Sequence, residues 1–336
     1  MLPGAMGKTL DLQHRLRACP ECGQRYSADA RFCPFDGSQL ELEEWDPESD
    51  KLVGQVIDNR YRVLAAIGEG GMGTVYKVRH TTLERLFAMK VLRKDMAREE
   101  LAQRFTREAK AAASVHHPGV VEITDFGRLP DKRPYFVMEL LDGESLAARL
   151  ARAPLPPTEV IAIARQLATA LAAAHDRGVI HADVTPANVF VLADTPLHVK
   201  LLDFGLAQLA GESADDNPDF VVGTPSYISP EQLRGLGPTE RSDQYGLGAV
   251  LFELLAGKPP FVDTEVHAIC LQHLNAPIPE ITSPHGTVPT KLANLIVTCL
   301  QKSPQARFAN MRALIAVLDD LDRVVERSGW RRWLGG

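Results

Sequence analysis

Gly68-Glu69-Gly70-Gly71-Met72-Gly73-Thr74-Val75 is a G-x-G-x-x-G-x-V sequence, and its flanking residues indicate the class of fold. Glycine-rich loops of similar spacing cradle phosphates in more than one class of protein. In a dinucleotide-binding fold the loop opens a helix, whereas here it leads into an alternating apolar run at residues 75–78. That alternation predicts a strand. The segment therefore predicts a strand–loop–strand hairpin that folds over phosphate groups.

A lysine and a glutamate follow the loop at positions where they could form a pair. Lys90 lies in the apolar run of residues 87–92, which predicts the next strand. Glu108 lies within residues 101–112, where apolar residues recur at helical spacing. Taken singly, each is an ordinary solvent-exposed charge. Behind this loop, the two predict a pair that holds the lysine ammonium against the α- and β-phosphates of a nucleotide.

Three motifs in the second half of the chain complete the pattern. They are His181-Ala-Asp-Val-Thr-Pro-Ala-Asn188, then Asp203-Phe-Gly205 fifteen residues later, then Gly223-Thr-Pro-Ser-Tyr-Ile-Ser-Pro-Glu231. Together with the glycine loop they stand in the order found in protein kinases. From about residue 58 to residue 325 the chain resembles a Hanks-type Ser/Thr protein kinase of the bacterial kind.

The resemblance implies a role for each motif. Asp183 would accept the proton of the attacking hydroxyl, and Asn188 and Asp203 would hold Mg²⁺ against the phosphates of ATP. Lys90 and Glu108 would complete the catalytic set. The residues implied for ATP binding are Ile67, Gly68, Glu69, Gly70, Gly71, Met72, Gly73, Thr74, Val75, Ala88, Lys90, Met138, Glu139 and Leu141.

The implied fold is the α+β, bilobal protein-kinase fold. An antiparallel β-sheet N-lobe with one regulatory helix would span residues 58–138, and a mostly helical C-lobe residues 142–325. The residues agree, because short Val-, Ile- and Tyr-rich runs fill the first range and helical apolar stripes fill the second. Within the C-lobe, the family pairs Glu231 with a later arginine, which we place at Arg307.

The first 40 residues predict a small metal module. Cys19-Pro-Glu-Cys22-Gly and Cys33-Pro-Phe-Asp36-Gly repeat one phrase, with Asp36 in place of a fourth cysteine. Two such turns can surround one tetrahedral Zn²⁺. Residues 1–40 are similar to the zinc-ribbon segments ahead of enzyme domains in some bacterial regulatory proteins. The resemblance implies a structural or recruiting zinc; three ordinary thiols in a loop-rich segment are the alternative.

The ends of the expected kinase domain differ in charge. Six acidic residues fall within residues 41–50 with no basic partner, so residues 41–57 predict an extended acidic linker. An acidic helical turn is the alternative. Residues 326–336 form a basic and aromatic tail with Trp330 and Trp333. We expect this tail to cap the last helix rather than to contact a partner or a membrane surface.

Two departures from the family bear on activity. Ala182 replaces the arginine that usually pairs with a phosphorylated activation-loop residue. Thr185 replaces the lysine that contacts the transferring phosphate, and losing one such electrostatic stabiliser costs about 10²–10³ in rate. The main interpretation is therefore an active Ser/Thr protein kinase, which Thr185 in place of the lysine can attenuate. The second is an ATP-binding pseudokinase that acts as a regulatory binding module.

Composition limits the other classes of function. The 336 residues carry a net charge of −6, which argues against a surface built to bind nucleic acid. No apolar run approaches 18 residues, and the first twenty residues show no secretory signal. Five cysteines in a chain of this length favour a reducing compartment, so we expect a cytoplasmic protein with protein substrates. A small-molecule phosphotransferase is disfavoured, since residues 223–231 resemble a peptide-docking segment.

Overall fold

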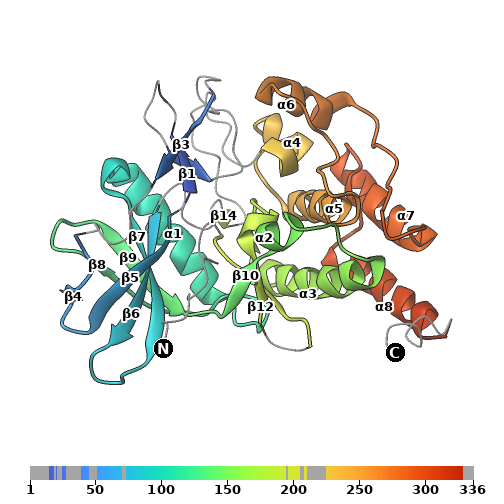
Figure 1. Cartoon of the computed structure of the whole chain (residues 1–336). Coiled ribbons are helices and arrows are strands. Elements are labelled where there is room, and N and C mark those ends of the chain that lie inside the picture. The colour runs from blue at the N-terminus through green and yellow to red at the C-terminus, as the bar shows by residue number, and fades with distance from the viewer. Residues whose placement is uncertain are drawn as a thin grey trace, which may run out of the picture. The chain divides into compact units, whose positions relative to one another are not determined.

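The computed structural model describes residues 15–18, 20, 25–27, 39–44, 51–69, 73–193, 196–204, 208–209 and 225–327 (Figure 1). The chain divides into two units. The first comprises Met1–Thr106 and Ile123–Leu140, and the second comprises Arg107–Glu122 and Leu141–Gly336. The division passes through helix α1 (Glu99–Ser114), where the helical spacing of residues 101–112 predicted a helix.

The first unit contains a six-stranded antiparallel sheet with strand order β4-β5-β6-β7-β9-β8 (Figure 1). The glycine loop joins two consecutive strands of this sheet, as the sequence predicts. This sheet is the antiparallel N-lobe sheet of the expected bilobal fold. The strands are β4 (Val56–Ile57), β5 (Tyr61–Glu69), β6 (Gly73–His80), β7 (Leu86–Leu92), β8 (Ile123–Arg128) and β9 (Pro134–Glu139).

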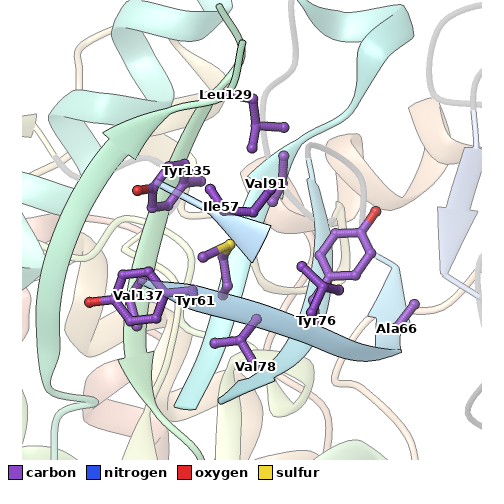
Figure 2. Close-up of a cluster of buried hydrophobic side chains, with 11 residues drawn as sticks. Ile57, Tyr61, Ala66, Tyr76, Val78, Val91, Leu129, Tyr135 and Val137 are labelled. Carbon is purple, nitrogen blue, oxygen red and sulfur yellow. The ribbon is translucent and has the colours of Figure 1, made fainter. Parts of the chain in front are cut away.

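One side of this sheet carries a hydrophobic core drawn from several strands. Figure 2 shows these side chains gathered together, among them Tyr61, Tyr76 and Tyr135. Ile57 joins them from β4 because the chain reverses sharply after it, with φ of 48° at Asp58 and 56° at Asn59. Asp and Asn tolerate this left-handed conformation better than most residues. Burying one side chain of this size stabilises the fold by about 1.5–3 kcal/mol.

Strands enter the predicted acidic linker at both of its ends. Strand β3 (Glu41–Glu44) pairs with β1 (Arg15–Ala18) in a three-stranded sheet that also holds β2 (Arg25–Ser27), and β4 extends the larger sheet. The register sets Arg15 opposite Glu44. Opposite charges across antiparallel strands are favourable. The linker prediction counted repulsion only among sequence neighbours and so missed this basic partner strand.

The second unit is mainly helical, as expected for the C-lobe (Figure 1). Its central helices pack against one another, with α3 in contact with both α5 and α8. The helices are α2 (Leu146–Leu150), α3 (Pro157–His175), α4 (Pro230–Leu233), α5 (Glu240–Ala256), α6 (Val266–Asn275), α7 (Thr290–Cys299) and α8 (Met311–Arg327). The strands are β10 (Gly143–Ser145), β11 (Val179–Ile180), β12 (Val189–Leu192), β13 (Val199–Leu201) and β14 (Gln208–Leu209).

Helix α5 forms the centre of this unit and positions the loop that carries Asp183. It is buried on nearly every side, from Ser242 to Leu255, which is unusual for a helix that also carries polar residues. Gly246 lets the helix approach that loop, since a Cβ there would lie 3.1 Å from Cβ of Val184. The loop is thus packed directly on a rigid element.

Several predicted features lie outside the described residues. They include the proposed zinc ligands Cys19, Cys22, Cys33 and Asp36, the loop tip Gly70, Gly71 and Met72, Gly205, and the tail tryptophans. Within the part of the chain that the structure describes, no helix is both long and apolar enough to cross a membrane.

Candidate active site

In the first unit, four of the residues expected to bind ATP share one face of the sheet. The register sets Val75 opposite Lys90 and Ala88 opposite Met138. Directly opposite residues, and residues two apart on one strand, point to the same side. Lys90 therefore shares a face with Ala88, Val75 and Met138, away from the tyrosine-rich core. The ammonium of Lys90 lies 6.0 Å from the ring centre of Phe136, within cation–π range.

The end of the glycine loop needs a residue without a side chain. A Cβ on Gly73 would lie 2.9 Å from the carbonyl oxygen of Val91 and 3.2 Å from Cγ of Lys90. Gly68, at the other end, has no atom within 4 Å of such a Cβ. Gly73 is therefore fixed by packing against the strand that carries Lys90, whereas nothing in the described packing requires Gly68.

The remaining predicted nucleotide residues occupy separate places. Ile67 lies in β5, Glu139 ends β9, and Leu141 begins the long segment of the second unit. Glu108 lies on α1 in the part that belongs to the second unit. Lys90 and Glu108 thus stand in different units, and their pairing remains a prediction.

In the second unit, the predicted catalytic residues Asp183 and Asn188 contact each other. The Asn188 side-chain Nδ2 donates to the Asp183 carbonyl oxygen at 2.9 Å and to its carboxylate Oδ2 at 2.8 Å. Both residues lie between β11 and β12, and Asn188 ends a single 3-10 turn over Pro186–Asn188. These two bonds fix the Asp183 side chain relative to its own backbone, as a general base requires.

Asp243 anchors the backbone just before Asp183. This carboxylate is 1% exposed on α5. It accepts hydrogen bonds from the backbone N–H of His181 (3.0 Å) and of Ala182 (2.7 Å), and it contacts Nε2 of His175 at 2.7 Å. A buried carboxylate is stable only when it is satisfied in this way. The hydrogen bonds that offset the cost of burying Asp243 therefore also fix the backbone of this loop.

His181 connects the same loop to the Asp203 motif. Its Nε2 lies 3.0 Å from the Leu202 carbonyl oxygen, and its Nδ1 accepts from the Asp183 N–H at 3.3 Å. A neutral ring with its proton on Nε2 satisfies both contacts. The ring also packs on Phe204, with centroids 4.7 Å apart. His181 is fully buried, and its role is structural.

A hairpin brings the two predicted Mg²⁺ ligands together. Strands β12 and β13 pair, and the Leu202 N–H donates to the Asn188 carbonyl oxygen at 2.8 Å, so Asp203 follows directly beside Asn188. The Asn188 amide nitrogen is used on Asp183, which leaves its oxygen for a cation. An amide oxygen and a carboxylate are the hard ligands that Mg²⁺ prefers. Asp203 has a φ of 28°, a strained conformation of the kind found at functional sites.

The two departures from the kinase family are both buried. Ala182 is 8% exposed with φ of 64°, and Thr185 is 2% exposed with an extended backbone. The left-handed conformation at Ala182 costs energy for any residue with a Cβ, and the hydrogen bond to Asp243 holds it. The predicted activation loop beyond Leu209 lies outside the described residues up to Pro225.

The predicted Glu231–Arg307 pair is confirmed. Arg307 donates from Nη1 and Nη2 to the two carboxylate oxygens of Glu231 at 2.7 and 2.8 Å, and both side chains are buried. Ser242 donates a further bond to Glu231. Burial alone would raise the pKa of Glu231, but the bonds and charge of Arg307 outweigh it and hold the pKa below its ordinary value. This pair anchors the predicted peptide-docking segment to the helical core.

Sequence reasoning missed three residues that contact the loop before Asp183 or its anchor: Asp243, His175 and Gln232. Gln232 donates from Nε2 to the Ala182 carbonyl oxygen at 2.9 Å. The sequence gives no signal that Asp243 needs a buried partner, because it lies among the polar residues 240–244 in the first turn of α5. Nothing in the sequence identifies that partner as a backbone about sixty residues away.

Comparisons with known proteins agree with this geometry. The family model described as protein kinase domain matches residues 61–316. The serine/threonine-protein kinase pkn3 of Myxococcus xanthus is 38% identical over 288 residues, which is 82% of this chain and 52% of that protein. The serine/threonine-protein kinase PrkC of Bacillus subtilis is 38% identical over 281 residues, 82% of this chain and 43% of that protein.

A solved structure gives the same answer for the fold. The crystal structure of the Mycobacterium tuberculosis PknI kinase domain is 31% identical with a TM-score of 0.62, and the match covers 80% of this chain and 98% of that one. The chain spans about half the length of the curated relatives it matches.

Proposed function

The chain belongs to the protein kinase domain family, and from that premise we propose that it transfers the γ-phosphoryl group of ATP to Ser or Thr of protein substrates. The observation that carries the proposal is the pair of bonds from Asn188 to Asp183. They hold a carboxylate in the orientation that a base needs toward a substrate hydroxyl. A module that only binds nucleotide has no evident use for this arrangement.

The proposed roles follow from the residues described in each of the two units. In the first unit, Lys90 and the glycine loop bind and orient the triphosphate. In the second, Asp183 takes the proton of the attacking hydroxyl, and His181 and Asp243 hold its backbone still. Asn188 and Asp203 would hold Mg²⁺, which neutralises charge on the phosphates when it is bound. Among the described residues, no cluster of three or more His, Cys, Asp or Glu side chains forms a separate metal site.

The function is tested by coupling ADP release to a protein substrate. Purified chain with Mg-ATP should release ADP faster when a generic basic protein is added, because the protein hydroxyl is the phosphoryl acceptor. If the added basic protein does not speed up ADP release, although the chain still binds ATP, the result would instead support the pseudokinase. The protein substrate itself, and the cytoplasmic location that the buried free thiols of Cys270 and Cys299 favour, are part of this proposal.

Mg-ATP should raise the melting temperature of the chain. A ligand that binds only the native state stabilises it by mass action, at about 2.7 kcal/mol when its concentration is a hundred times Kd. The shift should disappear in Lys90→Met, which removes the ammonium but keeps the apolar stem on the sheet. Lys258→Met, which changes an exposed lysine just after α5 in the second unit, serves as control and should keep the shift. No shift at millimolar ATP in the wild type would contradict any nucleotide-binding function.

Thr185→Lys should raise kcat with little change in the KM for ATP. A lysine at this position restores positive charge near the transferring phosphate, where negative charge moves in the transition state. We expect a gain of about ten-fold, equal to about 1.4 kcal/mol. Because Thr185 is buried, the melting temperature of the variant is measured beside its kinetics. High wild-type activity that the change lowers would show that another residue already supplies the contact.

We also propose that residues 1–40 bind one structural Zn²⁺ through Cys19, Cys22, Cys33 and Asp36, and that this module can recruit a protein partner. The support is the repeated C-P-x-[C/D]-G phrase and the shortage of core in a segment of this size. Elemental analysis should find about one zinc per chain, lost in Cys19→Ser but kept in Cys299→Ser. Metal-free protein purified under reducing conditions would refute the site.

A further inference from the structure

The side chain of Gln232 joins two segments that the proposed reaction needs. Its Oε1 accepts from the backbone N–H of Ser229 at 3.1 Å and from the Ser229 hydroxyl at 2.7 Å. Its Nε2 donates to the carbonyl oxygen of Ala182 at 2.9 Å. Ser229 lies in the predicted peptide-docking segment of residues 223–231, and Ala182 directly precedes Asp183. One amide therefore connects the peptide-docking segment to the catalytic loop.

The chemistry of the neighbours fixes the orientation of this amide. The Ser229 N–H can only donate and the Ala182 carbonyl can only accept, so the oxygen of Gln232 must face the first and its NH₂ the second. The Ser229 hydroxyl, which is fully buried, adds a second bond in the same sense. Ser229 stands where the kinase motif has alanine, so this hydroxyl is a feature of the chain itself.

Both peptide units that flank Ala182 are consequently held by hydrogen bonds, each to a different side chain. Asp243 accepts the Ala182 N–H at 2.7 Å, and Gln232 donates to the Ala182 carbonyl oxygen. Between them lies the left-handed φ of 64°, a conformation that persists only under such restraint. The direction of the chain into Asp183 depends on both contacts.

We propose that Gln232 is a positioning residue for the proposed phosphoryl transfer, acting through Ala182 on Asp183. Ala182 has no side chain that could pair with a phosphorylated loop. The Gln232 contact ties the docking segment to the catalytic loop through backbone atoms, so it works without such a phosphate. The expected effect on kcat rests on the proposed function. The contact between the docking segment and the catalytic loop rests on the hydrogen bonds alone.

The test uses Gln232→Glu, which keeps the acceptor for Ser229 and loses the donor for Ala182 at neutral pH. We expect kcat to fall by about ten-fold, the effect of one lost bond and one unpaired carbonyl, with the KM for ATP unchanged. A protonated carboxyl can donate again, so the ratio of variant to wild-type kcat should rise as the pH is lowered. A merely structural role would not give this pH-dependent rescue.

Gln166→Glu is the matched control. Gln166 also bridges two backbone groups of the second unit, donating to Leu197 at 2.9 Å and accepting from Val199 at 3.0 Å, but it does not contact the catalytic loop. The control should lose stability without loss of kcat or pH-dependent rescue. Equal kcat in Gln232→Glu and the wild type, or equal losses in the two variants, would overturn the proposal.

Amide hydrogen exchange over residues 181–185 separates this inference from the proposed function. Exchange there should accelerate in Gln232→Glu and stay unchanged in Gln166→Glu, whether or not the wild type transfers phosphate. An inactive wild type with this exchange pattern would refute the kinase activity but would still show that Gln232 holds the loop at Ala182. Unchanged exchange in Gln232→Glu would refute the role of Gln232 in holding this loop.

Discussion

Asp183→Asn should reduce kcat by about 10²–10⁴-fold, the range that a positioned general base contributes. The fold should survive, because an amide oxygen at this position can still accept the bond that Asn188 donates to the Asp183 carboxylate at 2.8 Å. We therefore expect the melting temperature and its rise with Mg-ATP to match the wild type. The loss should appear as a slower chemical step, measured in steady-state and single-turnover assays.

Asp176→Asn is the matched control for that result. Asp176 is a half-exposed carboxylate of the same unit, and it forms an ion pair with Arg312 at 2.6 Å. Neutralising it should leave kcat unchanged. A variant at Asp183 that retains wild-type kcat would show that this carboxylate is not the base, whatever the rest of the site contains.

Arg307→Met should lower the free energy of unfolding by about 3–5 kcal/mol, since removing one partner of a buried ion pair leaves the other charge uncompensated. Glu231 would lose both bonds from the guanidinium, and the Arg241 carbonyl oxygen would lose a third at 2.6 Å. Activity should fall as well, because Glu231 anchors the docking segment. Urea denaturation followed by circular dichroism measures the stability change.

Arg312→Met provides the comparison, because the Arg312–Asp176 pair is exposed, and such pairs contribute at most about 1 kcal/mol. Similar unfolding midpoints for the two variants would contradict the structural role of Glu231.

The pKa of Glu231 fixes the direction in which stability changes with pH. Arg307 holds the folded-state pKa of Glu231 below its ordinary value, so the contribution of Glu231 to stability is present above that ordinary value and is lost as the pH falls through the folded-state pKa.

Much of the fold could be predicted from local patterns. The alternation after Gly73 predicts a strand, and β6 begins there; the apolar stripe from Val160 to Ala174 predicts a helix, and α3 buries it. Such patterns work because burial repeats every two residues in a strand and every 3.6 in a helix. The kinase resemblance predicted the Glu231–Arg307 pair, and the structure contains it.

What local patterns could not give are contacts between distant polar groups. Asp243 and Gln232 act on the backbone of Ala182, and a backbone atom leaves no mark in the sequence that would identify it as a partner. The strand at Glu41–Glu44 was missed for a related reason. Its pairing partner at Arg15–Ala18 lies more than twenty residues away, while the repulsion among its acidic neighbours is visible at once.

We propose that the Asp183 loop catalyses phosphoryl transfer despite Thr185 and Ala182. The most direct measurement is transfer of ³²P from γ-labelled ATP, with Mg²⁺, to a basic protein, followed by acid hydrolysis to identify the labelled amino acid. We expect label on phosphoserine or phosphothreonine from the wild type, and almost none from Asp183→Asn. Absence of protein-bound label from a wild-type chain whose melting temperature rises with Mg-ATP would contradict the claim and identify a nucleotide-binding pseudokinase.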